Sequence, residues 1–135
     1  MIKKLTIQTN KPGLYEFTSQ IQPLVKTANI NEGICHVYVQ HTSASLIIQE
    51  NADPSVQVDL QNWLSRLVKE NDSLYTHTIE GPDDMPSHIR SVLTATSLSI
   101  PILNAQLALG TWQGIYLWEH RHQPHLRNVL VYCGD

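Results

Sequence analysis

The stretch SLSIPILNAQLALGTWQGIYLWEHRHQPHLRNVLVYC, residues 97–133, decides the fold class. It is rich in Val, Ile, Leu, Tyr and Trp, and several of these residue types favour β-strands. Four strand-like runs cover residues 97–103, 106–110, 113–119 and 126–133, and the breaks between them fall at Asn104-Ala105, Gly110 and residues 121–125. This end of the chain is therefore predicted to be β-structure with no helix between the strands.

The remainder of the chain mixes strands and helices without a regular alternation. Strands are expected near residues 3–9, 14–17, 34–40 and 45–49, and helices near residues 18–29, 54–69 and 85–95. Asp53 followed by Pro54 is typical of a helix start, with Asp as the N-cap and Pro at the first helical position. The order predicts a single α+β domain over residues 1–135, a mostly antiparallel sheet or sandwich with about three helices packed on it.

Composition excludes several classes of protein. The chain has 135 residues and a formal net charge of −3, without the basic footprint of a duplex nucleic-acid binder. No apolar run approaches the ~20 residues of a membrane span, and the first residues lack the apolar core of a signal peptide. We therefore expect a cytoplasmic protein with no nucleic-acid or membrane partner, in which Cys35 and Cys133 are reduced core thiols.

The first candidate site begins at His41, where an apolar strand gives way to a loop. Site residues often occupy such positions. Ser43 and Ser45 lie close enough in sequence for a Ser–His nucleophile pair, although hydroxyl groups that merely close a turn are the alternative. We favour a functional role for His41.

The second candidate site surrounds Asp84 and His88, four residues apart at the start of a predicted helix. This spacing places them on one face, where a carboxylate can orient an imidazole or share a metal ion with it. With His77 and His41 they suggest a three-histidine, zinc-type site next to an acidic segment. Arg90 and the helix N-terminus suit a phosphate group. The alternative is that Asp84 caps the helix and His88 is an ordinary surface residue.

The third candidate site lies in residues 109–121, which carry Trp112, Tyr116, Trp118 and Glu119. The aromatic residues fit either a ligand site or core packing. A buried Glu119 needs a partner, which a protonated histidine or a metal ion would provide. Residues 121–127 form the only basic patch, either a solvated hairpin tip or an anion site.

Four blocks of this sequence resemble the signature blocks of the YjbQ family: residues 39–46 (VQHTSASL), 50–54 (ENADP), 81–90 (GPDDMPSHIR) and 109–117 (LGTWQGIYL). The resemblance extends over essentially the whole chain. It implies a small cytoplasmic α+β protein that forms homotrimers and gathers histidines in a polar pocket able to hold a metal ion. Some members of that family have a secondary thiamine-phosphate synthase activity.

The resemblance also implies roles for individual residues. It implies metal binding, zinc or magnesium, by His41, His77 and His88. Together with the candidate sites above, it leads us to expect catalytic roles for Asp84, Glu119 and Gln113. We expect substrate binding by Ser43, Asn51, Arg90, Thr111 and Trp112. The implied reaction condenses a pyrimidine pyrophosphate with a thiazole phosphate, and Trp112 or Tyr116 would stack on the pyrimidine.

Three functions follow as alternatives. The first is a metal-dependent, thiamine-phosphate synthase-like transferase acting on phosphorylated small molecules. The second is a metal-activated hydrolase in which Asp84 or Glu119 is the base. The third is a protein that binds a metal ion or a metabolite without turnover.

Overall fold

The computed structural model describes residues 1–135 and contains three helices and eight strands in the predicted order. The elements are β1 (Ile2–Thr9), β2 (Gly13–Glu16), α1 (Thr18–Ala28), β3 (Glu32–Val39), β4 (Ala44–Glu50), α2 (Pro54–Leu67), α3 (Asp84–Leu93), β5 (Ser97–Leu103), β6 (Gln106–Leu107), β7 (Gln113–Glu119) and β8 (His125–Gly134). The α+β class is confirmed. No helix has the length and apolar composition needed to cross a bilayer.

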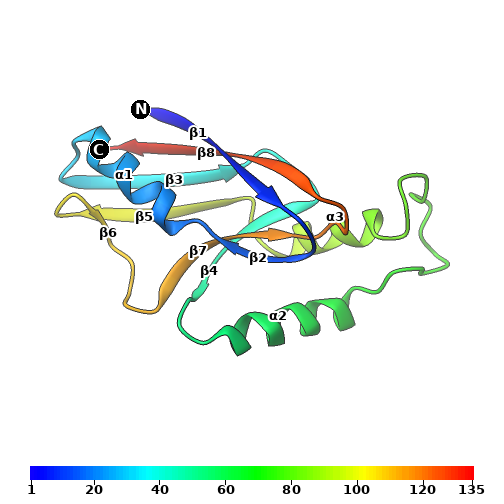
Figure 1. Ribbon diagram of the computed structural model, residues 1–135. Coiled ribbons are helices and arrows are strands. Elements are labelled where there is room, and N and C mark those ends of the chain that lie inside the picture. Colours follow the sequence, from blue (N-terminus) through cyan, green and yellow to red (C-terminus); the bar gives the residue numbers. More distant parts are fainter.

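The strands form two antiparallel sheets (Figure 1). The larger sheet has the order β1-β8-β3-β5-β6, and the smaller has the order β2-β7-β4. The predicted turn at Asn104 and Ala105 joins β5 to β6 as a two-residue hairpin. Both residues have positive φ angles, 53° and 58°, which are typical of a type I′ turn.

One core joins the two sheets. It contains 16 buried side chains, which come from both sheets and from α1 through Ile21 and Val25. Pro23 lies inside α1 and removes one intrahelical hydrogen bond, yet the helix continues because this apolar face is buried. Cys35 and Cys133 face each other across β3 and β8, and both are free thiols, as predicted.

Helix α2 lies on the opposite side of the smaller sheet from the main core (Figure 1). Asp53 caps it as predicted, because its carboxylate accepts the backbone N–H of Ser55. Only Leu64 of this helix is fully buried, packed against Trp118 of β7. Trp63 and Leu67 of the same helix are more than half exposed.

Helix α3 covers one end of the smaller sheet next to β4 (Figure 1). It follows a long connection without helix or strand, residues 68–83. Its N-cap position is Asp83, whose side chain makes no capping hydrogen bond, and Asp84 is the first helical residue. The alternative in which Asp84 serves as the helix cap is therefore wrong, which leaves its carboxylate for other partners.

Candidate functional site

The open cluster consists of His77, Asp84 and His88. Asp84 and His88 lie one turn apart on α3, and His77 approaches from the loop before the helix. The Nε2 atoms of His77 and His88 lie 2.6 Å and 3.2 Å from the same atom, Oδ2 of Asp84. One potential ligand atom from each residue fits within 4.8 Å of the other two. The predicted one-face arrangement of Asp84 and His88 is present.

Exposure differs sharply within the open cluster. The side chain of Asp84 is 2 % exposed, whereas those of His77 and His88 are 49 % and 31 % exposed. A buried carboxylate thus lies beneath two imidazoles that remain accessible from solvent. This geometry lets a small ion or substrate approach the imidazoles without any rearrangement of the main chain.

The contact made by Nδ1 of His88 determines whether Nε2 acts as a donor or an acceptor. Nδ1 of His88 lies 3.0 Å from the carbonyl oxygen of Thr42. A carbonyl only accepts, so Nδ1 carries the proton and a neutral His88 presents the lone pair of Nε2 to Asp84. Two acceptors facing each other repel, and a cation between or beside them, either a second proton or a metal ion, removes the repulsion. Metal-binding histidines commonly donate their other N–H to a backbone carbonyl in this way.

Arg121 holds the carboxylates at the start of α3. Its Nε donates to Asp83 at 2.9 Å, its Nη1 donates to Oδ1 of Asp84 at 2.7 Å, and its Nη2 donates to the carbonyl of Glu80 at 3.0 Å. Arg121 therefore occupies one oxygen of Asp84, while the histidines share the other. The connection between β7 and β8 is tied to α3 through this side chain.

Asp84 is ionised in this environment. Burial alone raises the pKa of Asp84, but the hydrogen bond from His77 and the positive charge of Arg121 hold the pKa below its ordinary value. The pKa of Asp83 is likewise lowered, because hydrogen bonds from His122 and Arg121 outweigh its burial. The open cluster therefore presents a permanent negative charge to any cation.

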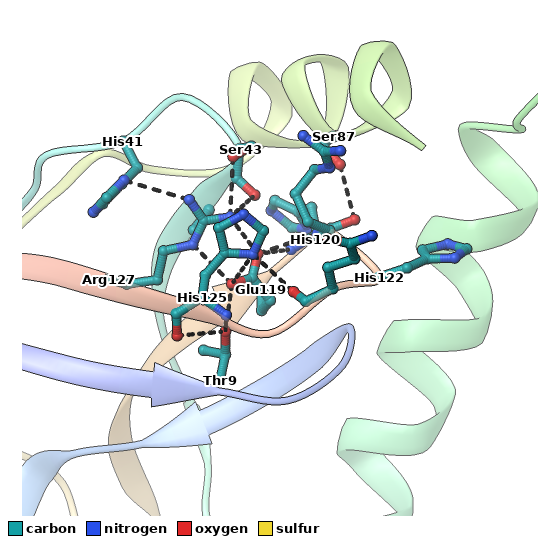
Figure 2. A network of polar contacts seen from close by, with 12 residues as sticks. Thr9, His41, Ser43, Ser87, Glu119, His120, His122, His125 and Arg127 are labelled. Atoms are coloured by element: carbon teal, nitrogen blue, oxygen red, sulfur yellow. Dashed lines mark hydrogen bonds and ion pairs between the residues drawn. The ribbon is translucent and has the colours of Figure 1, made fainter. Parts of the chain in front are cut away.

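The buried network centres on Glu119, Arg127 and Thr9 (Figure 2). The carboxylate of Glu119 is fully buried and forms a two-point ion pair with Arg127. Thr9 donates to Oε1 at 2.6 Å, and the backbone N–H groups of His120 and Arg121 donate to Oε2. The partner expected for a buried Glu119 exists: it is Arg127, and Nδ1 of His125 lies farther away, 3.9 Å from Oε1. Every acceptor position of Glu119 is occupied and none is reachable from solvent.

His41 belongs to the buried network and not to the open cluster. Its Nε2 accepts the backbone N–H of Asn128 at 2.8 Å, and its Nδ1 lies 3.3 Å from Arg127 (Figure 2). Burial and the charge of Arg127 lower the pKa of His41 and favour the neutral ring. His41 and His88 line the same cavity of about 330 Å³, but no ligand atom of His41 falls within the 4.8 Å group. The structure brings together two of the three predicted metal-binding histidines, with Asp84 as the third member.

Ser43 and His120 complete the buried network. Ser43 accepts a hydrogen bond from Arg127 at 3.0 Å, and the ring nitrogens of His41 contact Arg127 and Asn128 instead of Ser43. His120 is buried and its Nε2 lies 2.8 Å from the Oγ of Ser45 (Figure 2). Burial lowers the pKa of His120 to about 3, which keeps the ring neutral. The carbonyl of His120 accepts from Ser87, so the network also anchors α3.

A further set of predicted site residues lies at the other end of β7. Asn51, Thr111, Trp112 and Gln113 are exposed near the start of that strand, where the N–H of Asn51 donates to the carbonyl of Trp112. Glu119 ends the same strand six residues later, roughly 20 Å away at ~3.3 Å per residue. Within one chain, these residues lie far from the open cluster.

The aromatic side chains proposed for stacking have different environments. Tyr116 is buried, accepts from Gln57 and donates to the carbonyl of Glu50, so no ligand reaches its ring. Trp112 is 62 % exposed and remains accessible. Of the two rings, only that of Trp112 is accessible to a ligand.

Sequence reasoning missed the roles of Arg121, Arg127 and Thr9. Arg127 shares the strand face of Val129, Val131 and Cys133, all buried. A basic residue at a core-facing strand position indicates a buried acidic partner. The alternation of buried and exposed residues in β8 could therefore have predicted an acidic partner for Arg127. Arg121 gave no comparable signal because it lies in a connection without periodicity.

Comparison with known proteins defines the class: the chain belongs to the YjbQ/UPF0047 family. The family model described as "UPF0047 protein YjbQ-like" matches residues 3–134. The chain is 55% identical to UPF0047 protein sll1880 of Synechocystis over 130 residues, which cover 96% of this chain and 88% of that protein. It is 41% identical to UPF0047 protein YjbQ of Escherichia coli O157:H7, covering 96% and 94% of the two chains.

Solved structures agree with the fold. The crystal structure of an uncharacterised YjbQ/UPF0047 protein from Clostridium acetobutylicum superposes with a TM-score of 0.90 at 32% identity. The match covers 98% of this chain and 99% of that chain. The family and the fold are thereby established.

Proposed function

We propose that this protein is a metal-dependent enzyme that acts on a phosphorylated small molecule, with the open cluster as its metal site. The observation that carries the proposal is the donor set, two imidazole nitrogens and one carboxylate oxygen within 4.8 Å. The orientation of His88, whose Nε2 lone pair faces Asp84, supports it. Imidazole ligands favour zinc or another transition ion over magnesium, which prefers oxygen ligands.

The residues around the open cluster fit such an ion. Asp84 would bind through Oδ2 while Arg121 holds Oδ1, and His77 and His88 would bind through Nε2. When bound, a divalent ion polarises phosphate oxygens and neutralises charge on a departing phosphate. The positive end of the α3 helix dipole lies at the same place and favours an anionic substrate there.

The family resemblance supplies the reaction that we propose for this site. A thiazole ring nitrogen would attack the methylene carbon of a pyrimidine pyrophosphate, forming the C–N bond of thiamine phosphate. The C–O bond to pyrophosphate would break, and pyrophosphate would leave with the electron pair. This reaction needs positive charge near the leaving group more than it needs a base. A divalent ion held by His77, His88 and Asp84 would supply that charge beside the leaving group.

A hydrolase at the same site is the second candidate, and one observation favours it. The carboxylate of Glu80 is exposed and lies 3.9 Å from Nε2 of His77. It is available as a proton acceptor, unlike Glu119, which is sealed, and Asp84, whose two oxygens are both engaged. Activation of water by such a base would give hydrolysis of a phosphate ester in place of condensation.

Metal content tests the site. We would measure zinc, manganese, iron and magnesium by elemental analysis in untagged protein prepared without chelator. The wild type is expected to hold a transition ion near one per chain, and the His77→Ala/His88→Ala variant is expected to hold none. His36→Ala is the matched control, since His36 lies on the larger sheet and its ring forms one hydrogen bond, to Ser99. Equal metal content in all three proteins would contradict the proposal.

Product analysis separates the candidate reactions. The metal-loaded protein would be incubated with the pyrimidine pyrophosphate and the thiazole phosphate, and products identified by mass spectrometry. Thiamine phosphate that disappears in the His77→Ala/His88→Ala variant supports the transferase. Free pyrimidine alcohol and pyrophosphate support the hydrolase, with a loss in Glu80→Gln. A rise in Tm with either substrate and no product supports binding without turnover.

We also propose a homotrimer in the cytoplasm. Apolar side chains that are more than half exposed on α2, Val58, Trp63 and Leu67, support burial against further copies of the chain. The free thiols of Cys35 and Cys133 fit a reducing compartment. Light scattering of wild type and Trp63→Glu tests the assembly: the trimer mass is expected for the wild type, and a monomer throughout would refute it.

A further inference from the structure

A second polar pocket lies between α2, α3 and the connection from β7 to β8. Its lining includes Gln61 and Ser65 of α2, Lys69 and Glu70 just after α2, Arg90 of α3 and His122 of the connection. None of these residues belongs to the open cluster or lines the cavities next to it. Figure 2 shows His122 extending away from the buried network toward α2.

Arg90 is the unexplained group in this pocket. Its side chain is 5 % exposed, yet no carboxylate forms an ion pair with it. It donates one hydrogen bond, from Nη2 to the carbonyl of Val68 at 2.7 Å, and its buried Nε has no partner. A guanidinium has five N–H donors, and burying its charge is unfavourable unless an anion or several acceptors compensate it. The pocket next to it is where such an anion would lie.

The other lining groups are also donors. Trp118 donates to Oε1 of Gln61 at 2.7 Å, which fixes that amide and leaves its NH₂ group without a partner. The ammonium group of Lys69 forms no ion pair, and the hydroxyl of Ser65 forms no hydrogen bond. Glu70 is the one acid in the lining, and its carboxylate pairs with His122 at 2.6 Å. Arg90 and Lys69 carry two positive charges against the one negative charge of Glu70, so the net charge of the pocket is positive.

The size of the pocket limits its ligand. Its volume is about 230 Å³, below the roughly 300–1,000 Å³ of most small-molecule sites. A nucleotide is too large, whereas a tetrahedral oxyanion or the phosphate end of a small metabolite fits. Arginine recognises phosphate through two parallel hydrogen bonds, which would use the donors of Arg90 that now lack acceptors.

We propose that this pocket binds a phosphate group, either free phosphate or a small phosphate monoester, between Arg90 and Lys69. The site is separate from the metal site of the proposed function and does not rest on it. It gives Arg90 the phosphate role that its sequence position suggested, but in a different pocket from the histidines.

Calorimetric titration of the full chain with sodium phosphate tests the proposal, at an ionic strength held constant with sodium chloride. Lys69→Glu is expected to weaken phosphate binding at least tenfold, because it reverses a charge at the pocket. Arg66→Glu is the matched control: it makes the same charge change from an exposed position on α2 that does not line the pocket, and binding is expected to change less than twofold. Similar losses in both variants, or no phosphate-specific heat in the wild type, would overturn the proposal.

Two further measurements make the result specific. Arg90→Met is expected to abolish phosphate binding while its Tm without phosphate stays at or above that of the wild type, because an uncompensated buried charge is removed. A lower Tm would instead show that Arg90 only caps the end of α2. If Arg90→Met does not fold, Lys69→Gln replaces it, with weakened binding expected and unchanged binding contradicting the site.

The ligand source and the independence of the site are tested in the same titration. Tighter binding of glycerol phosphate than of phosphate supports a metabolite, and the reverse order supports free phosphate. The His77→Ala/His88→Ala variant is expected to bind phosphate as the wild type does. Loss of phosphate binding in that variant would assign the anion to the open cluster and overturn the second site, whatever the metal content proves to be.

Discussion

The open cluster and the buried network use the same chemical groups for different ends. Each holds a carboxylate contacted by an arginine, with histidines nearby. In the buried network, fixed donors fill every acceptor position of Glu119. In the open cluster, one carboxylate oxygen of Asp84, Oδ2, faces two accessible imidazoles. Residue type alone therefore does not mark a functional site, and the difference lies in which acceptors remain available to a ligand.

Replacement of the Glu119 carboxylate is expected to give the largest difference in stability between the buried network and the open cluster. Glu119→Gln keeps the shape of the side chain but leaves the charge of Arg127 buried without a partner. We expect the free energy of unfolding to fall by about 3–5 kcal/mol, measured by urea denaturation followed by circular dichroism. The double variant Glu119→Gln/Arg127→Met should recover part of this loss. A loss below ~1 kcal/mol for the single variant would show that the network is not structural.

The pH dependence of stability tests the buried network, because His120 is buried in it as a neutral ring. Its pKa is about 3 in the folded protein and 6.5 for an ordinary histidine, so the unfolded chain binds a proton first as the pH falls. The contribution of the neutral His120 ring to the free energy of unfolding is complete above pH 6.5. It is lost as the pH falls toward 3, by about 1.4 kcal/mol for each pH unit. Tm measured from pH 7 to pH 4 should fall less steeply in His120→Gln than in the wild type. Parallel profiles would mean that this ring is not buried as a neutral group.

Metal addition tests the open cluster through a gain in stability, because a ligand that binds only the folded state stabilises that state. Zinc at about 100 times its Kd is expected to raise the free energy of unfolding by about 2.7 kcal/mol. The rise should vanish in His77→Ala/His88→Ala and persist in His36→Ala. Stabilisation of all three proteins to the same extent would place the zinc elsewhere.

The smallest change is expected at the rim of the open cluster. Glu80 is 62 % exposed, so Glu80→Gln should alter the free energy of unfolding by less than ~0.5 kcal/mol. Thermal and urea unfolding without metal would measure it. A larger loss would show that the open cluster, like the buried network, contributes to the stability of the fold.

Much of the fold was predictable from local patterns. The order of strands and helices, the Asp53 cap and the turn at Asn104-Ala105 all follow from residues adjacent in sequence. The pairing of Asp84 with His88 was predictable for the same reason, since one helical turn joins them. Local spacing decided these features, and the structure confirmed them.

The remainder of the site depended on pairings between distant strands. His41 lies beside Asn128 and Arg127 because β3 pairs with β8, a contact between residues 86 and 87 positions apart. That pairing draws His41 into the buried network and away from His77. No spacing in the sequence indicates this pairing. The prediction that His41, His77 and His88 form one group therefore lacked the strand pairing that places His41 elsewhere.

The place of β8 in the larger sheet also governs when that sheet can form. β8 lies between β1 and β3, and Ile2 pairs with Tyr132. During synthesis, the residues of β1 are made 116 to 130 positions before their partners in β8, the only neighbour of β1. The strand that joins β1 to β3 is therefore the last to be made. The sheet must therefore close after translation of residue 134, through contacts of high sequence separation that fold slowly. Arg127 and the strand that completes the buried network arrive in that same final step, so an unfinished chain holds Glu119 without its partner.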